Sequence, residues 1–137
     1  MYLYSFEKLI VWNDAKEITK TIYQLTASFP SSEKFGLSAQ LRRAAVSICS
    51  NIAEGSARSS YKDQAHFTNI AFGSTVEIVN QLILAFELNF LEESQYLDLR
   101  KSLLGLSNKL NSLRNTQLSR MSKTSSNQPI NKSTHQP

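Results

Sequence analysis

The chain is 137 residues long and carries 15 Lys and Arg against 11 Asp and Glu, so its formal net charge is +4. This length suits one domain with a core of useful size, and the 4 Gly and 3 Pro favour helices over an all-β fold. One cysteine excludes an intramolecular disulfide framework and a zinc site built from several cysteines, which indicates a cytoplasmic protein. We expect no signal peptide and no membrane span, because charged and amide side chains interrupt the apolar stretches.

Hydrophobic periodicity predicts four helices, over residues 6–28, 38–57, 61–89 and 94–118. Pro30 ends the first helix, because the residue before a proline avoids the α region. We expect Ser60 to cap the start of the third helix, and Asn89, which tolerates the left-handed conformation, to end it. Short connections between the helices predict an all-α, antiparallel up-down-up-down four-helix bundle over residues 1–119.

Residues 120–137 differ in composition from the predicted helices. Most residues from Ser122 onward are Ser, Thr, Asn or Gln, and Ile130 is the one large apolar residue among them. Such a segment buries too little apolar surface to offset the entropy lost on ordering. We therefore predict a disordered, polar and basic tail over residues 120–137.

The third predicted helix carries two apolar stripes, whose centres lie about 120° apart at ~100° per residue. The first stripe suits the core of the bundle. The second stripe consists of Phe72, Val76, Val79, Ile83, Phe86 and Phe90. Monomers rarely leave a patch of this kind exposed, so the second stripe is a candidate oligomer interface. The alternative is a thick core within one chain.

The second predicted helix has polar residues beside its apolar stripe. Glu54 and Arg58 are spaced as an i, i+4 ion pair. Together with two residues of the third helix, this flank forms a candidate polar seam between helices or between subunits. The candidate seam residues are Ser47, Asn51, Glu54, Arg58, Ser74 and Glu77. The alternative is a solvated face.

All acidic residues lie within residues 1–98, whereas basic residues continue along the fourth helix and into the tail. Surface Lys and Arg neutralise phosphates without reading base sequence, so these cations are candidate nucleic-acid contacts. The candidates are Arg42, Arg43, Arg58, Lys62, Arg100, Lys101, Lys109 and Arg114. The alternative is that they pair with acids of neighbouring helices or subunits, or are solvated.

Catalysis has little support in the sequence. His66 is the one histidine before the tail, so any nucleophile–histidine relay would depend on it. Asp63 and His66 have the spacing of half a di-iron site, but residues 1–134 contain no second pair. Cys49, beside apolar residues, is interpreted as a small core residue. We predict no enzyme activity, no cofactor and no metal site.

Four sequence blocks occur in order, namely residues 6–12 (FEKLIVW), 40–48 (QLRRAAVSI), 51–55 (NIAEG) with Arg58, and 70–74 (IAFGS) with Glu77. Together they resemble the four-helix-bundle family of 23S rRNA intervening-sequence proteins. That family is related to the accessory variability determinants of bacterial diversity-generating retroelements. The resemblance covers about residues 5–115. One departure is Cys49, where the family commonly has proline, and we expect no kink there because cysteine keeps its backbone N–H.

The resemblance implies a bacterial protein that assembles as a barrel-like homopentamer and uses the second stripe of the third helix. It also implies that residues in the blocks at 51–55 and 70–74 pack helices together, and that they do not form a reaction centre. The retroelement relatives bind nucleic acid and a reverse transcriptase through basic surfaces. Two functions follow. The first is a non-enzymatic oligomeric scaffold, structural or binding another protein, and the alternative is sequence-independent binding of RNA or DNA.

Overall fold

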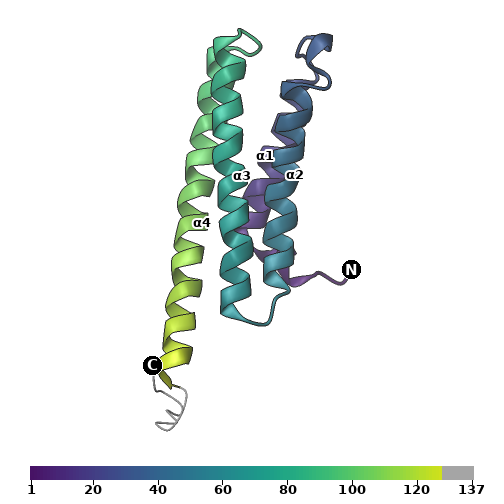
Figure 1. Ribbon diagram of the computed structural model, residues 1–137. Helices are drawn as coiled ribbons and strands as arrows, with labels where there is room; N and C mark the ends of the chain where they lie inside the picture. The colour runs from purple at the N-terminus through teal and green to yellow at the C-terminus, as the bar shows by residue number, and fades with distance from the viewer. Residues whose placement is uncertain (128–137) are drawn as a thin grey trace.

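The computed structural model describes residues 1–127, with side chains through residue 123. Within these residues the chain is all-α, and four long helices make up most of it. They are α1 (Ile10–Thr26), α2 (Leu37–Ser56), α3 (Tyr61–Glu87) and α4 (Glu93–Asn127). Short 3-10 helices, η1 (Ser5–Lys8) and η2 (Ser31–Glu33), precede α1 and α2. Each long helix packs against the next in the chain, and α4 also contacts α1 (Figure 1).

The helix boundaries follow local signals in the sequence. Leu9 is extended, with φ −78° and ψ 132°, and separates η1 from α1, so α1 begins later than the predicted start at residue 6. The Ser60 hydroxyl oxygen accepts a hydrogen bond from the backbone N–H of Asp63 at 3.1 Å, which confirms the predicted cap of α3. Asn89 has a φ of 61°, which confirms the left-handed residue after α3.

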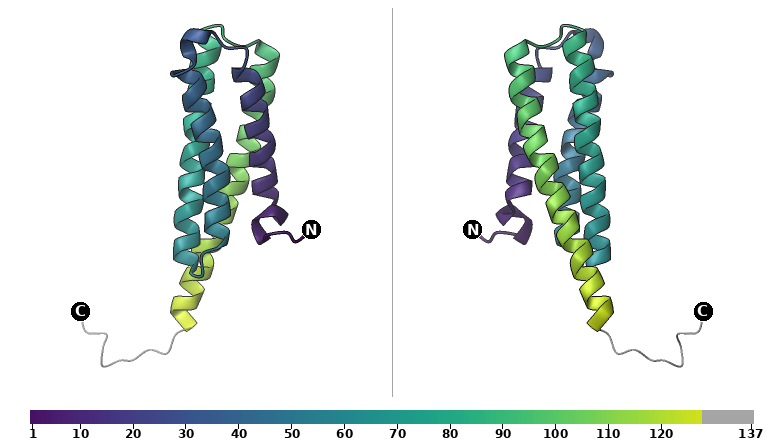
Figure 2. Two further views of the ribbon diagram at one scale, coloured as in Figure 1. Left: turned by 90° about the vertical axis from the view of Figure 1, so that its right-hand side faces the viewer. Right: turned by 90° about the vertical axis from the view of Figure 1, so that its left-hand side faces the viewer.

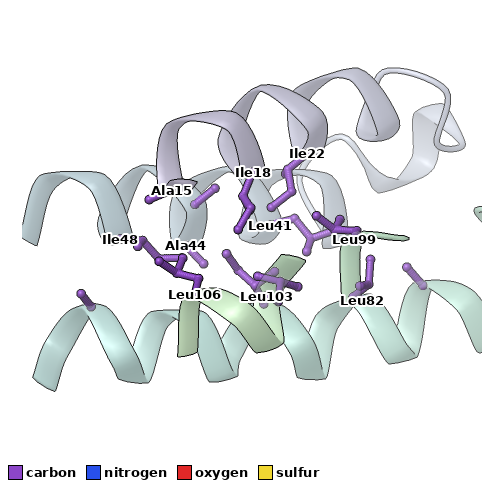
Figure 3. Packing of buried hydrophobic residues seen from close by; sticks show 14 of the residues in the cluster. Ala15, Ile18, Ile22, Leu41, Ala44, Ile48, Leu82, Leu99, Leu103 and Leu106 are labelled. Atoms are coloured by element: carbon purple, nitrogen blue, oxygen red, sulfur yellow. The ribbon is translucent and has the colours of Figure 1, made fainter. Parts of the chain in front are cut away.

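The core consists of the apolar stripes predicted for each helix. Leu41 and Ile48 of α2, and Leu103 and Leu106 of α4, are at most 1% exposed. Side chains from all four helices point toward one another in the middle of the bundle (Figure 3). The helices are thus held together mainly by burial of aliphatic side chains, at about 25 cal/mol for each Å² removed from water.

The second apolar stripe of α3 faces α4 of the same chain. The ring of Phe86 stacks on that of Tyr96 with centroids 4.3 Å apart, and the ring of Phe90 lies 5.5 Å from that of Phe29. Five of the six stripe residues are partly buried against the core, namely Phe72, Val79, Ile83, Phe86 and Phe90. The stripe therefore does not by itself require a second chain. Helix α3 packs between α2 and α4 and so has neighbours on both sides, and the role of the stripe as an oligomer interface remains a prediction.

Helix α4 is longer than predicted. It continues to Asn127, beyond the expected end of the bundle at residue 119, and Figure 2 shows it passing the ends of the other helices. Near the predicted end, Gln117 is 7% exposed and its side-chain oxygen accepts a hydrogen bond from the Thr68 hydroxyl at 2.8 Å. A polar residue thereby occupies a core position. Residues 120–127, which were predicted to begin a disordered tail, instead belong to α4. The rest of the predicted tail, residues 128–137, lies outside the described part of the chain.

Among residues 1–127, only α3 combines the length and the apolar composition that a membrane span requires. Core helices of soluble proteins also pass this test. Ile78, Leu82 and Ala85 of α3 are at most 2% exposed within the bundle. These residues belong to the core, whereas Val76 and Leu84 of the same helix are 51% and 47% exposed.

Substitutions of two glycines inside helices are expected to change the stability in opposite directions. A Cβ atom on Gly73 would meet no atom within 4 Å, whereas one on Gly55 would lie 3.0 Å from the Cβ of Phe67. We expect Gly73→Ala to raise the free energy of unfolding by about 0.5–1 kcal/mol, because alanine favours the helix. We expect Gly55→Val to lower it by about 1–3 kcal/mol through overpacking against α3. Urea unfolding measures both, and effects of the same sign would contradict the packing described here.

Candidate nucleic-acid interface

The candidate cations divide between the two ends of the bundle. Arg42 and Arg43 lie near the start of α2, and Arg100 and Lys101 lie near the start of α4. These starts share one end of the bundle, as the ring contact between the segments after α1 and after α3 indicates. Arg58, Lys62 and Arg114 lie at the other end, around the α2–α3 connection and the lower part of α4.

At the first end, the two arginines of α2 are held by neighbouring helices. Arg42 donates through Nε to the Thr26 hydroxyl oxygen at 2.8 Å, and its guanidinium lies 4.6 Å from the centroid of the Tyr23 ring. Arg43 forms an ion pair with Glu77 of α3 and donates to the side-chain oxygen of Gln40 at 3.1 Å. These contacts join α2 to α1 and to α3. A phosphate would have to displace them.

Two cations of α4 also have partners within the chain. Arg100 donates to the Tyr96 hydroxyl and lies over its ring, and Lys109 pairs with Asp14 of α1. Lys101 is exposed. Arg43 and Lys109 thus pair with acids of neighbouring helices, as in the alternative above. Arg42 contacts residues of α1, whereas Arg100 contacts a tyrosine of its own helix.

At the second end, side chains from α3 and α4 surround a shallow hollow of about 470 Å³. Its polar lining comes from Lys62, His66 and Asn69 of α3, and from Arg114 and Asn115 of α4. The α3 residues are spaced i, i+4 and i+7, and so lie on one side of the helix. All five can donate hydrogen bonds, His66 in either neutral tautomer or as the cation. The hollow is therefore suited to an anion.

Arg114 is held in place at the edge of this hollow. It donates to the Asn69 side-chain oxygen at 2.7 Å and to that of Asn111 at 2.6 Å. Its guanidinium also lies 5.1 Å from the centroid of the Phe72 ring, at the junction of α3 and α4. A guanidinium has five N–H donors in a rigid plane, so these two bonds leave others for a ligand. Arg58 is placed similarly over the Phe67 ring, at 4.7 Å.

Sequence reasoning selected Lys62 and Arg114 but did not select His66, Asn69 or Asn115 as ligand contacts. The i, i+4, i+7 spacing of Lys62, His66 and Asn69 on α3 could have indicated His66 and Asn69. Nothing in the sequence indicates that Asn115 lies opposite them, because about fifty residues separate the two groups. Only the packing of α4 on α3 brings them together.

Most of the predicted polar seam joins α2 to α3 within the chain. The hydroxyl groups of Ser47 and Ser74 lie 3.0 Å apart, and the Asn51 amide donates to the Ser47 hydroxyl at 3.1 Å. Glu54 is the exception. It is exposed, and the expected pair with Arg58 does not form because Arg58 instead lies over Phe67 of α3. The aromatic ring offers that guanidinium a partner on the neighbouring helix.

Cys49 lies half-buried in α2, where the helix runs without interruption from Leu37 to Ser56. Burial raises the pKa of its thiol, and the contact with the Thr19 hydroxyl, 3.4 Å away, lowers it by less. A protonated, partly buried thiol is a poor nucleophile. Within residues 1–127, no three His, Cys, Asp or Glu side chains are placed to hold a metal ion.

Comparison with known proteins agrees with this architecture. Residues 7–112 match the family described as 23S rRNA-intervening sequence protein. The fold is similar to the crystal structure of a protein of unknown function from the S23 ribosomal protein family of Bacteroides thetaiotaomicron. The TM-score is 0.70 at 23% sequence identity, over 77% of this chain and 98% of that one, which shows a shared fold. No match was found among curated proteins. Since the family match spans most of the chain and reaches from η1 into the fourth core helix, the chain belongs to the 23S rRNA-intervening sequence protein family.

Proposed function

We propose that this protein binds RNA or DNA through the phosphate backbone, without reading base sequence, at the hollow between α3 and α4. The observation that carries the proposal is the convergence of Lys62, His66 and Arg114 from two helices on one hollow. Lys and Arg contacts to phosphates release condensed counterions, which supplies most of the free energy of sequence-independent binding. Lys62 and Arg114 would supply such contacts from the two sides of the hollow.

The charge around the hollow favours a polyanion. Helix α4 has no acidic residue after Asp98, so all charged side chains in the part that lines the hollow are basic. Asp63 is adjacent to Lys62 in sequence, but the two side chains lie about 100° apart around α3. Asp63 is therefore not among the residues lining the hollow. The names of the matched family and of the similar structure both refer to ribosomal components, which is consistent with a nucleic-acid partner.

A second candidate function is an oligomeric scaffold, structural or binding another protein. The observation that favours it is an exposed apolar segment at the N-terminus, where Tyr2 and Tyr4 are 82% and 64% exposed. Assembly of an antiparallel up-down-up-down bundle into a barrel-like homopentamer remains a prediction from the family resemblance. The two functions are compatible, because the apolar segment and the basic hollow involve different residues.

We expect Lys62→Gln to reduce the salt dependence of nucleic-acid binding. Fluorescence anisotropy with short duplex DNA, single-stranded DNA and single-stranded RNA would be measured between 50 and 300 mM salt. Loss of one phosphate contact lowers the slope of log K against log [salt] by roughly 0.9 for duplex DNA and 0.7 for single strands. The three probes also show which nucleic acid is preferred.

Lys101→Gln is the matched control, because it removes the same charge from an exposed lysine at the other end of the bundle. We expect it to leave the salt slope unchanged. Equal slopes for wild type and Lys62→Gln, or equal losses for the two variants, would contradict binding at the hollow. Failure of the wild type to bind any probe at 50 mM salt would favour the scaffold function.

A further inference from the structure

A cavity of about 230 Å³, which we call the end cavity, lies at the end of the bundle where α1 begins. Helix α1 starts at Ile10, whereas α2 continues at this end to Ser56. Figure 2 shows that α1 does not reach as far as the other three helices here, where η1 precedes it. Residues of η1, α2, α3 and α4 enclose the end cavity at the place that α1 leaves open.

The lining of the end cavity combines apolar surface with buried polar side chains, and none of the residues that line it is charged. Leu9, Ile52 and Leu113 supply the apolar surface. Thr68 and Gln117 also line the cavity, and they are only 4% and 7% exposed. Burial of a polar group costs free energy unless the group is hydrogen-bonded. The partners that these side chains have, and those that they lack, therefore indicate what the cavity can bind.

Gln117 has an amide group that the chain satisfies on one side only. Its side-chain oxygen accepts a hydrogen bond from the Thr68 hydroxyl, whereas its Nε2 has no hydrogen-bond partner among the described residues. This nitrogen is not sealed in the core, because the one completely buried side-chain atom without a partner there is Oε1 of Gln81. An amide nitrogen carries two N–H donors, so Gln117 can donate to a ligand in the end cavity.

Gln64, one turn before Thr68 on α3, supplies the complementary group. Its Nε2 donates to the backbone oxygen of Arg58 at 2.9 Å, which orients the side chain. Its Oε1 receives no hydrogen bond from the part of the chain that the structure describes, and so it is available as an acceptor. The end cavity thus offers a donor from α4 and an acceptor from α3 beside an apolar wall.

These features define the chemistry of a ligand. A charged molecule would lose its hydration without gaining an ion partner, and a purely apolar one would leave the Gln117 donor unpaired. The volume of about 230 Å³ is below the ~300–1,000 Å³ of most ligand pockets, which limits the ligand to about one ring.

We infer that the end cavity binds a small, uncharged ring compound that carries a carboxamide or lactam group. The ring lies against Ile52 and Leu113, and the amide edge accepts from Gln117 and donates to Gln64. This inference does not rest on the proposed function, because the end cavity and the hollow between α3 and α4 have no lining residue in common.

Benzamide is the probe for the first test, because it is an uncharged ring that carries both amide groups. Toluene, benzoate and the benzamidinium ion have a similar shape and serve as apolar, anionic and cationic controls. In heteronuclear NMR spectra of the full chain, benzamide is expected to shift the side-chain amide signals of Gln64 and Gln117 until they saturate. We expect its affinity to exceed that of each control by about tenfold or more, since the controls leave a buried polar group unpaired.

The outcomes of this titration are distinct. Failure of benzamide to saturate these signals would overturn the inference and leave water as the occupant of the cavity. Equal affinities for benzamide and toluene would overturn it as well, because the amide groups would then contribute nothing.

The second test removes the two hydrogen-bonding groups one at a time. Gln117→Leu and Gln64→Met roughly keep the size of the side chain, and we expect each to lower the affinity for benzamide about tenfold. Gln24→Met is the matched control and should keep the wild-type affinity, because Gln24 is exposed on α1 and does not line the cavity. Wild-type affinity in both amide variants would overturn the inference.

Circular dichroism verifies that each variant retains its helix content. If Gln117→Leu does not fold, Gln64→Met decides the question, because Gln64 is only partly buried.

Discussion

Replacing Leu103 by alanine is expected to lower the free energy of unfolding by about 3–5 kcal/mol. Leu103 is fully buried in α4, among residues from all four helices (Figure 3). The substitution removes apolar contacts and leaves a cavity that a close-packed core fills only in part. Urea unfolding monitored by circular dichroism would measure the change as a lower midpoint with a similar slope.

Leu104→Ala is the matched control, since it makes the same chemical change one residue further along α4. Leu104 is 62% exposed, so its truncation leaves no buried cavity. We expect an effect within about 0.5 kcal/mol, as for surface substitutions in general. Similar losses at the two positions would show that α4 is rotated from the orientation described here.

The second large effect is expected for Phe86→Glu. This substitution removes the ring that stacks on Tyr96 and places a carboxylate against the apolar α3–α4 seam. Loss of aromatic packing and desolvation of a charge both oppose folding. Because Phe86 is only half-buried, we expect the free energy of unfolding to fall by about 2–4 kcal/mol, less than for a deeply buried charge.

Val76→Glu tests the same stripe at its exposed position. Val76 is 51% exposed, so the new carboxylate can remain in water and should alter stability by less than about 0.5 kcal/mol. If the stripe is instead the interface between copies, both variants would dissociate an oligomer and leave the folded subunit stable. Thermal unfolding and light scattering together distinguish these outcomes.

The proposed function depends on which basic residues the fold places at each end of the bundle. The α2–α3 connection places Lys62 at the start of α3, and Arg114, Asn115 and Leu118 of α4 line the opposite side of the hollow. Arginines at the other end of the bundle are instead used to join helices. Some of the basic residues therefore have a structural role, which a count of basic residues in the sequence does not distinguish from a role in binding.

The sequence by itself determined the four helices and most of the core. Apolar residues at three- and four-residue spacings identify the buried face of a helix because the periodicity is a local property, as at Leu41 and Ile48. Local hydrogen bonding and backbone preference likewise identified Ser60 and Asn89 at the ends of α3. The resemblance to 23S rRNA intervening-sequence proteins, which was carried by short ordered blocks, is confirmed by the family match.

Only the tertiary structure decided which helix covers which face. Periodicity shows that α3 has a second apolar stripe, but the neighbour that packs on it depends on how the helices are ordered in space. The same reason applies to the contacts of the arginine side chains. Arg42 reaches Thr26 on α1, and Arg114 reaches Asn69 on α3, across distances in sequence that local rules do not address. The hollow at Lys62 and Arg114 exists because two helices dock there, and docking depends on the whole core.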